Sequence, residues 1–285
     1  MAKPRILLTG STGFVGRAVT AELLAGGYAI RHVIRTGSKD RILSLGPRDD
    51  VIETEDLFLR SPSWWADTVA GCDIILHLAW YAEPGKYQLS DKNLDCLTGT
   101  IHLAQGAMQA GVRRFVGVGT CLEYDLSQGN VHPDTALDPQ SPYAAAKAAC
   151  ALSLGQMLPQ AGTSFLWARL FYLFGAEEDD RRLTAYLHRQ LAAGAQADLS
   201  DGAQVRDFMD VADAARLLVS DALSDRRGTS NICSGLGITV RVLAERIADE
   251  YGRRDLLNFG ARAANPDDPP VVIGARDIRD LKGPT

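Results

Sequence analysis

A tyrosine and a lysine four positions apart, Tyr143 and Lys147, are the side chains of this sequence best suited to acid–base chemistry. Residues at this spacing share one face of a helix, so the phenol and the ammonium would lie together. A nearby ammonium favours the tyrosinate and is expected to lower the pKa of the phenol. Such a phenol can pass a proton to or from a carbinol oxygen while hydride moves to or from a nicotinamide. The alternative is an amphipathic helix with a surface lysine, which this spacing alone would often satisfy.

A glycine-rich segment near the N-terminus has the context of a phosphate-binding loop. Residues 9–16 read TGSTGFVG, directly after a short apolar run and before a helical pattern. Gly10 permits a tight turn, Gly13 lets the backbone approach a pyrophosphate, and Gly16 allows close packing of helix on sheet. The free N–H groups at the start of the helix favour an anion. The segment therefore predicts a dinucleotide site, and the alternative is a tight turn without a ligand.

The end of the second apolar run indicates which dinucleotide would bind. An acidic side chain there would bind the ribose hydroxyl, whereas an arginine accommodates a 2′-phosphate. The sequence has Arg35 at this point and no carboxylate before Asp40, with Arg17, Ser38 and Lys39 as further candidates. NADP(H) is therefore favoured over NAD(H), and the alternative is a solvated arginine at the end of a strand.

Short apolar runs alternate with amphipathic stretches, which is typical of βαβ units and a parallel sheet. The strands are expected at 6–9, 29–34, 51–53, 73–78, 114–118 and 164–170, and the helices at about 14–25, 91–110, 142–158, 181–193, 211–223 and 240–251. After a charged loop at 177–182 the alternation breaks, residues 262–270 are expected to be irregular, and a short segment follows at 271–273.

These elements predict an α/β fold, a Rossmann-type doubly wound parallel sheet with a small C-terminal substrate-binding lobe. Residues 1–174 would mainly form the NADP-binding Rossmann domain. Residues 175–285 would mainly form a smaller α/β lobe, with some of the chain crossing back to the first domain. Thr120 would lie at the carboxyl end of the fifth strand, where open α/β sheets place their ligands.

The composition narrows the class of protein. The formal net charge is −5 with a pI near 5.6, which argues against nucleic-acid binding. The five cysteines are widely spaced without a CxxC pair, so we expect reduced thiols, and the scattered histidines predict no metal site. The sequence shows neither a secretory signal nor an apolar run of membrane-spanning length, and a reducing cytoplasm fits these features.

Taken in order, the motifs resemble the extended branch of the short-chain dehydrogenase/reductase superfamily, the nucleotide-sugar epimerases, dehydratases and reductases. The likeness covers nearly the whole chain. It rests on residues 10–16, the acidic turn Asp56-Leu57, HLAW at 77–80, Asn93, TGT at 98–100, YAAAK at 143–147, RDF at 206–208 and Asn231-Ile232.

The resemblance implies roles for single residues. Lys147 would also bind the nicotinamide ribose, and Thr120 would hydrogen-bond the substrate oxygen. Arg206 would contact a diphosphate, for which a guanidinium fork is suited. The alternative for Arg206 is a structural pair with Asp207 or Asp210.

The full set of site residues expected from motif and resemblance is as follows. The catalytic residues are Thr120, Tyr143 and Lys147, and no metal ligand is expected. The coenzyme would contact Gly10, Thr12, Gly13, Phe14, Val15, Gly16, Arg35, Asp56, Leu57, Leu78, Ala79, Trp80, Asn93, Val118, Tyr143, Lys147, Phe171 and Leu173. The substrate would contact Thr120, Cys121, Tyr143, Tyr172 and Arg206.

Departures from the family pattern indicate the subclass. Family dehydratases carry an acidic pair directly after the catalytic threonine, whereas here Cys121-Leu122 follows, and Glu123 is the nearest carboxyl. Tyr172 stands where many relatives carry asparagine. Family epimerases commonly retain NAD through an acidic residue after the second strand, and Arg35 instead suits exchangeable NADPH. Residues 119–124, GTCLEY, look most like compact 4-ketoreductases of deoxysugar pathways.

We therefore expect an NADPH-dependent reductase of a nucleotide-linked 4-keto-6-deoxyhexose, with a nucleotide-diphosphate sugar as its substrate. The alternatives are a nucleotide-sugar epimerase with retained NAD(P), a catalytically silent NADP(H)-binding redox sensor, and a reductase of a carbonyl compound without a nucleotide. The resemblance also implies a homodimer formed through the helices at about 91–110 and 142–158.

Overall fold

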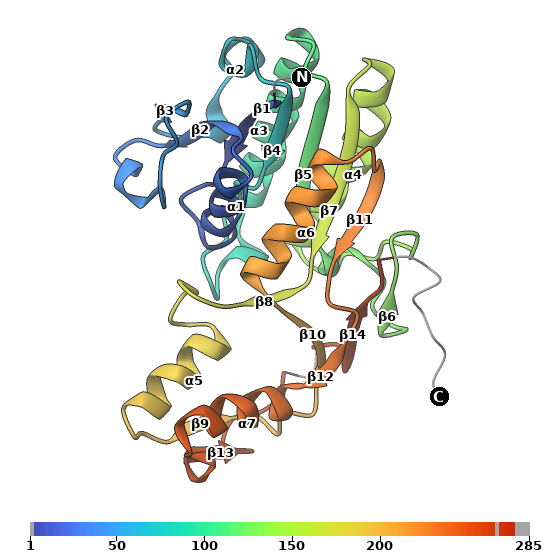
Figure 1. Ribbon diagram of the computed structural model, residues 1–285. Coiled ribbons are helices and arrows are strands. Elements are labelled where there is room, and N and C mark those ends of the chain that lie inside the picture. Colours follow the sequence, from blue (N-terminus) through green and yellow to red (C-terminus); the bar gives the residue numbers. More distant parts are fainter. Residues whose placement is uncertain (1–2, 266–267, 277–285) are drawn as a thin grey trace.

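A seven-stranded parallel sheet forms the centre of the larger lobe in the computed structural model, which describes residues 3–265 and 268–276 (Figure 1). Its strand order is β11-β7-β5-β4-β1-β2-β3, so the order reverses between β1 and β4. The strands are β1 Arg5–Thr9, β2 Ala29–Arg35, β3 Asp50–Thr54, β4 Ile74–His77, β5 Arg114–Thr120, β7 Ser164–Leu170 and β11 Gly228–Ile232. The predicted Rossmann-type doubly wound sheet is confirmed.

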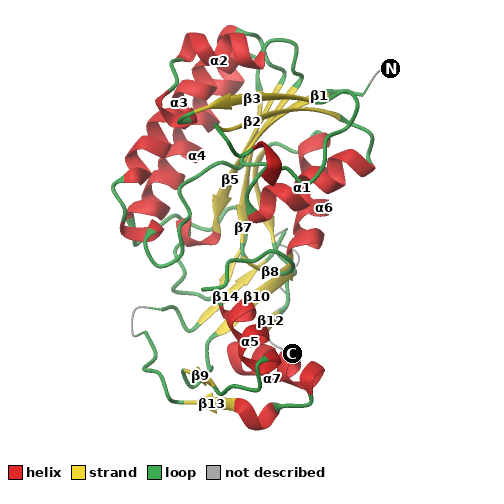
Figure 2. Cartoon of the chain, turned by 90° about the vertical axis from the view of Figure 1, so that its left-hand side faces the viewer, coloured by secondary structure: helices red, strands yellow, loops and turns green. Residues whose placement is uncertain are grey.

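Helices cover both faces of this sheet, as Figure 2 shows. Alternate residues of a strand point to opposite faces, and β1 follows this rule with Leu8 packing on one face and Leu7 on the other. Leu8 shares a cluster with Val19 and Leu218, and Leu7 shares another with Leu103. The first face is covered by α1 Phe14–Ala25 and α6 Val211–Leu223, and the second by α2 Pro62–Val69, α3 Lys92–Gln109 and α4 Pro142–Gln160.

The start of each helix shows how the sequence fixes the functional segments. Ser141 caps α4, because its hydroxyl accepts from the backbone N–H of Ala144 at 3.2 Å, and Pro142 occupies the first helical position. The helix start therefore places Tyr143 in the first turn of α4. By contrast, no side chain caps α1, whose first residues follow Gly13. The N–H groups of this helix start are left for another acceptor.

The smaller lobe is built around β10 Val205–Asp210. The second sheet has the order β12-β10-β14-β6, and β8 Tyr172–Phe174 also pairs with β10. The other strands are β12 Gly237–Thr239, β14 Val271–Gly274 and β6 Asn130–Val131. Below it, α5 Leu183–Ala192 and α7 Val240–Tyr251 share a hydrophobic cluster with the paired strands β9 Ala197–Leu199 and β13 Leu257–Phe259.

The chain passes between the two lobes several times. Although α6 and β11 come after residue 175, they belong to the large sheet and its covering layer, and β6 from residues 130–131 belongs to the second sheet. Helix α2 and strand β6 were not among the expected elements. Within the described part of residues 262–270 there is no helix or strand, and residues 266–267 lie outside the described residues.

Candidate active site

The expected site residues gather at the carboxyl ends of β1, β4 and β5, which are neighbours in the sheet. Gly10 follows β1 with a φ of 76°, and a Cβ there would lie 2.8 Å from the backbone N of Ala79. A Cβ on Gly16 would collide with the carbonyl of Gly10, whereas a Cβ on Gly13 would meet only that carbonyl at 3.4 Å. Packing therefore requires glycine at positions 10 and 16, whereas a Cβ at position 13 would make a single close contact.

Beneath this loop a buried histidine connects three elements. His77 Nδ1 lies 2.8 Å from Thr9 Oγ1, and its Nε2 lies 2.9 Å from Thr100 Oγ1. Thr100 donates to the carbonyl of Cys96, so its oxygen accepts from His77 Nε2–H, and Nδ1 accepts from Thr9. Burial, followed by the charge of Lys147, lowers the pKa of His77 to about 3. His77 is thus a neutral link that holds the loop, β4 and α3 together.

The ammonium of Lys147 lies close to the ring of Tyr143. Its Nζ donates to the carbonyl of Val118 at 2.6 Å and lies 3.9 Å from the ring centre of Trp80 and 5.9 Å from that of Tyr143. Burial lowers the pKa of Lys147 to about 8. The structure therefore brings Tyr143 and Lys147 together, as their spacing predicts.

One expectation about this pair is wrong. The sequence predicts that Lys147 lowers the pKa of Tyr143, whereas the pKa of the phenol is raised, first by burial and then by Tyr87, Glu123 and Cys121. The hydroxyl of Thr120 acts in the opposite direction without overcoming burial. Because burial raises the pKa of its phenol, Tyr143 stays neutral in this state of the protein.

The side chain of Glu123 is buried and paired within the protein. Its carboxylate, which is fully buried, accepts from the backbone N–H of Thr120 at 2.8 Å and pairs with Arg169 at 2.7 Å. It also accepts from the indole N–H of Trp167 at 3.0 Å, and it fills the space where a Cβ on Gly119 would lie. Glu123, the nearest carboxyl after Thr120 in the sequence, therefore orients Thr120 and is itself paired.

The residues expected to hold the substrate are only partly available. Arg206 is 3% exposed and pairs with Asp268 at 2.7 Å, while its guanidinium lies 5.2 Å from the ring centre of Tyr172. The expected structural pair of Arg206 with Asp207 or Asp210 is wrong. Asp207 accepts from backbone N–H groups that include that of Gly274, and Asp210 caps α6. Arg206 thus has a carboxylate where the expectation placed a diphosphate.

Cys121 and Tyr172 lie beside one another near this arginine. Burial raises the pKa of Cys121 to about 12, and burial together with the neighbouring Cys121 raises the pKa of Tyr172. Both groups are therefore neutral at ordinary pH, as a thiol and a phenol near Arg206.

Several expected coenzyme contacts have other partners. The side chain of Asn93 is fully used, since it accepts from Trp80 Nε1 at 2.8 Å and donates to the carbonyls of Tyr87 and Ser90 at 2.7 and 2.8 Å. Asp56 caps a short 3-10 helix, η2 Leu57–Leu59, by accepting from the backbone N–H of Phe58. Phe171 and Leu173 pack in hydrophobic clusters.

At the end of β2 the side chain of Arg35 is exposed, as expected for a phosphate-binding residue. Of its expected helpers, Arg17 pairs instead with Glu177 at 3.1 Å. Glu53 on the adjacent strand β3 places its carboxylate at this loop, where it accepts from the backbone N–H of Gly37 at 2.7 Å. This acidic group was missed because it is distant from Arg35 in sequence and neighbours it only through strand pairing.

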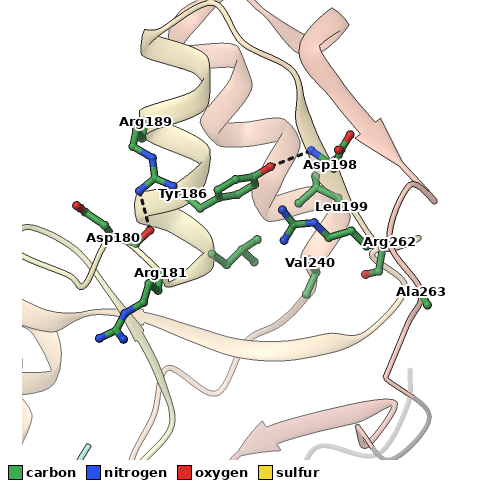
Figure 3. Close-up of a pocket in the computed structure, with 11 residues that line it drawn as sticks. Asp180, Arg181, Tyr186, Arg189, Asp198, Leu199, Val240, Arg262 and Ala263 are labelled. Atoms are coloured by element: carbon green, nitrogen blue, oxygen red, sulfur yellow. Dashed lines mark hydrogen bonds between the residues drawn. The ribbon is translucent and has the colours of Figure 1, made fainter. Parts of the chain in front are cut away.

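A cavity of about 410 Å³ in the smaller lobe adds residues that the sequence did not reveal (Figure 3). Tyr186 and Arg262 line it from α5 and from the segment after β13, with the guanidinium 4.9 Å from the ring centre. Arg262 has no ion-pair partner within residues 3–265 and 268–276. The cavity is lined by Asp180, Arg181, Leu183, Tyr186, Arg189, Asp198, Leu199, Ser200, Val240, Arg262 and Ala263.

An ion pair links this cavity to the segment that follows β4. Arg181, which lines it, lies 3.6 Å from Glu83 in the segment after β4. That segment leads into a second 3-10 helix, η3 Tyr87–Leu89, and the ring of Tyr87 contacts Tyr143 edge-on with 4.7 Å between ring centres. No motif could have identified Arg262, because its partner Tyr186 lies on a helix far away in the sequence.

Neither a metal site nor a membrane-spanning helix is found within the described residues. No group of three or more histidine, cysteine or acidic side chains is arranged to hold a metal ion there. The helices described are all too short or too polar to cross a bilayer. The five cysteines are all buried, and none of them forms a disulfide within the described residues.

Comparison with known proteins identifies the class to which this fold and site belong. The model of the NAD dependent epimerase/dehydratase family matches residues 6–232, and the chain therefore belongs to that family. It is an enzyme of the extended short-chain dehydrogenase/reductase type.

Individual relatives differ in the reactions that their names describe. The chain is 24% identical to the dTDP-6-deoxy-L-talose 4-dehydrogenase (NAD(+)) of Aggregatibacter actinomycetemcomitans, over 95% of this chain and 99% of the relative. It is 26% identical to a UDP-glucose 4-epimerase of Mycolicibacterium smegmatis, over 90% and 85% of the two chains. The crystal structure of DesIV, a dTDP-glucose 4,6-dehydratase from Streptomyces venezuelae with NAD bound, is 25% identical, covers 95% of this chain and 88% of its own, and superposes with a TM-score of 0.82.

Proposed function

We propose that this protein reduces the 4-keto group of a nucleotide-linked 6-deoxyhexose with NADPH. The observation that carries the proposal is the neutral phenol of Tyr143, which lies above Lys147 and beside Thr120 at the carboxyl end of β5. The buried phenol keeps its proton, and the protonated form is the one that can donate to the oxygen in carbonyl reduction. Because Glu123 is held by Arg169, the site offers no second free acid for dehydration.

The proposed reaction assigns one task to each side chain. Thr120 orients the carbonyl oxygen through its hydroxyl, which can both donate and accept. Tyr143 gives its proton to that oxygen as negative charge develops on it. Lys147, anchored on the carbonyl of Val118, supplies positive charge beneath the phenol and favours its transient tyrosinate form. The coenzyme supplies the hydride when bound.

The glycine-rich loop fits a dinucleotide. The start of α1 has no side-chain cap, a Cβ on Gly13 would meet only the carbonyl of Gly10, and the buried hydroxyl of Ser11 has no hydrogen-bond partner within the described residues. A pyrophosphate would satisfy such donors. These features support coenzyme binding by the loop.

We propose NADPH over NADH on the basis of Arg35, which is exposed at the end of β2 and can form a bidentate contact with a 2′-phosphate. Glu53 is the competing feature, because a carboxylate at this loop would suit the free ribose of NAD. Binding of the two reduced coenzymes to the Arg35→Ala variant separates these readings. We expect NADPH affinity to fall about tenfold, by roughly the strength of one charge-assisted hydrogen bond, while NADH affinity stays unchanged.

The nucleotide diphosphate would lie in the cavity of the smaller lobe. Arg262 and Tyr186 offer an unpaired guanidinium and an aromatic face, which suit a phosphate group and a base. The two curated relatives act, by their names, at C4 of nucleotide-linked hexoses. Both observations support a nucleotide sugar as the substrate.

The test is to incubate the purified enzyme with nucleotide-linked 4-keto-6-deoxyhexoses and to follow NADPH absorbance. No oxidation of NADPH across the thymidine, guanosine and cytidine series would contradict the proposal. Tyr143→Phe serves as the control, because it should abolish turnover and leave coenzyme binding nearly intact. A silent redox sensor would bind the coenzyme and turn over none of these substrates.

An epimerase is the second candidate, favoured by the carboxylate of Glu53 and by the UDP-glucose 4-epimerase relative. Such an enzyme would interconvert UDP-glucose and UDP-galactose without net consumption of coenzyme. It would also purify with dinucleotide bound. Sugar analysis of the reaction mixture and a spectrum of the purified protein therefore distinguish the two candidates.

We also propose a homodimer formed through α3 and α4. Leu94 on α3 is 66% exposed and Leu152 on α4 is 62% exposed, although both are large apolar residues. Apolar side chains gathered on two adjacent helices are typical of an interface. Light scattering of the wild-type protein and of a Leu94→Glu, Leu152→Glu variant tests this, and we expect a dimer for the first and a monomer for the second.

A further inference from the structure

The ammonium of Lys147 is buried without a carboxylate partner in the described part of the chain. Lys147 is 3% exposed, and its one hydrogen bond goes to the carbonyl of Val118. A buried cation in this position would ordinarily be paired with an acid. Here the nearest acid, Glu123, is already paired with Arg169.

The face of an indole ring takes the place of that acid. The ring centre of Trp80 lies 3.9 Å from Lys147 Nζ, closer than the rings of Tyr143 and Trp167, which both lie at 5.9 Å. A cation is attracted to the negative face of an aromatic ring, and tryptophan provides the strongest such interaction among the side chains. The attraction grows when both groups are shielded from water.

Asn93 fixes the indole in this place. The side-chain amide group of Asn93 donates both of its hydrogens to backbone carbonyls, so its oxygen must be the acceptor for Trp80 Nε1 at 2.8 Å. One of those carbonyls belongs to Tyr87, whose ring packs edge-on against Tyr143. A single amide thus holds the aromatic neighbours of both catalytic side chains.

We infer that Trp80 is a positioning residue that holds the Lys147 ammonium on its π face, and that Asn93 fixes Trp80 for this purpose. The indole keeps the cation directed at the space beneath Tyr143 without introducing a negative charge there. A carboxylate in the same place would neutralise the ammonium and weaken its effect on the phenol.

The groups that face Lys147 explain why the indole matters for its charge. They are Cys150 and Tyr143 on its own helix, Cys96 on α3, His77 on β4 and Glu123 after β5. His77 is neutral, the pKa values of both thiols are raised by burial, and Glu123 is paired. Burial lowers the pKa of Lys147 to about 8, so a weaker π face should lower it further, into the neutral range.

The experiment measures the Lys147 pKa directly and needs neither substrate nor coenzyme. The sequence has six lysines, so selective ¹³C labelling at Cε gives few signals, and Lys147→Met identifies the one of interest. Trp80 is replaced site-specifically by mono-, di- and tetrafluorotryptophan, which weaken the π face with little change of shape. We expect the Lys147 pKa to fall stepwise, by up to about one unit in total.

The matched control places the same fluorinated residues at Trp64, on α2. Its ring lies 5.4 Å from the guanidinium carbon of Arg60 and packs against Trp65, so it is also an aromatic residue near a cation. The Lys147 pKa should not change in this series. A Lys147 pKa that stays constant through the Trp80 series, or that moves equally in both series, would overturn the inference.

The role of Asn93 is tested in the chain that carries 5-fluorotryptophan at position 80. In the Asn93→Ala variant the ¹⁹F signal should shift and broaden, and the Lys147 pKa should move in the same direction as in the Trp80 series. An unchanged ¹⁹F signal would refute the assigned role. These outcomes do not depend on the proposed reaction, because a failed search for a substrate would leave the pKa measurements unaffected.

Discussion

Around Tyr143 the polar side chains are tied to partners within the chain, whereas the cavity of the smaller lobe leaves the guanidinium of Arg262 without an ion pair in the described residues. We use the name catalytic edge for the proposed site at the carboxyl ends of β1, β4 and β5. There, Val118 and Trp80 hold Lys147, and Glu123 holds Thr120. In the cavity, Arg262 rests on the ring of Tyr186. From this difference we expect that the groups proposed to react are preorganised, while the groups proposed to hold the substrate need a ligand to complete their contacts.

The largest effect should come from the phenol itself. Tyr143→Phe removes the proton donor and keeps the ring that packs against Tyr87, so we expect turnover to fall by about 10²–10⁴-fold with an unchanged fold. Steady-state kinetics and circular dichroism measure the two properties. A variant that keeps more than a tenth of wild-type turnover would show that the catalytic edge is not organised around this side chain.

The buried ion pair beneath Thr120 should have the largest effect on stability. Glu123→Gln leaves Arg169 buried without a carboxylate, and breaking such a pair costs about 3–5 kcal/mol of the free energy of unfolding. Urea denaturation measures this loss. The control is Glu83→Gln, which removes a carboxylate that also contacts an arginine but is partly exposed, and its effect should be much smaller. If both variants lost the same free energy of unfolding, the catalytic edge would not be more rigidly held than the protein surface.

The Arg262→Ala variant tests the prediction that the cavity of the smaller lobe binds a ligand. Loss of a charged hydrogen-bond donor should weaken binding of a nucleoside diphosphate by about 1.5–3 kcal/mol, measured by calorimetry, with little change in stability. Arg253→Ala is the control, because Arg253 is paired with Asp255 and does not line the cavity. If Arg206→Ala weakened binding and Arg262→Ala did not, then the ligand would displace Asp268 instead of filling the cavity.

The smallest effect concerns pH. The pKa of His77 is lowered from 6.5 to about 3, so the folded protein favours the neutral ring. The stability that depends on this neutral form is complete above about pH 6.5 and is lost as the pH falls towards 3. We expect a loss of about 2 kcal/mol between pH 7 and pH 5, measured by urea denaturation. A His77→Asn variant should lose much of this pH dependence. If the variant is as pH-sensitive as the wild type, then another group causes the dependence.

The signals that single out Thr120, Tyr143 and Lys147 are local, and the catalytic roles assigned to these residues stay predictions. The glycine spacing, the four-residue spacing of Tyr143 and Lys147, and Thr120 at the end of a strand each follow from the geometry of one element or one turn. The structure brings these side chains together as expected.

The environment of these residues could not be read from the sequence. The raised pKa of Tyr143, the Asp268 partner of Arg206 and the use of Asn93 by Trp80 all depend on segments distant in sequence. Hydrogen bonds of this kind depend on tertiary packing, and no periodicity of apolar residues encodes them. The pairing of Arg262 with Tyr186 is of the same type.

The return of α6 and β11 to the large sheet has a consequence for how the molecule can be dissected. A fragment ending at residue 174 would lack the edge strand β11 and the helix that buries Leu8 and Val19, so it would expose both an open strand edge and an apolar surface. The remainder would carry α6 and β11 without the sheet that they complete. Neither fragment is then an autonomous folding unit, and the two lobes must acquire their native structure together.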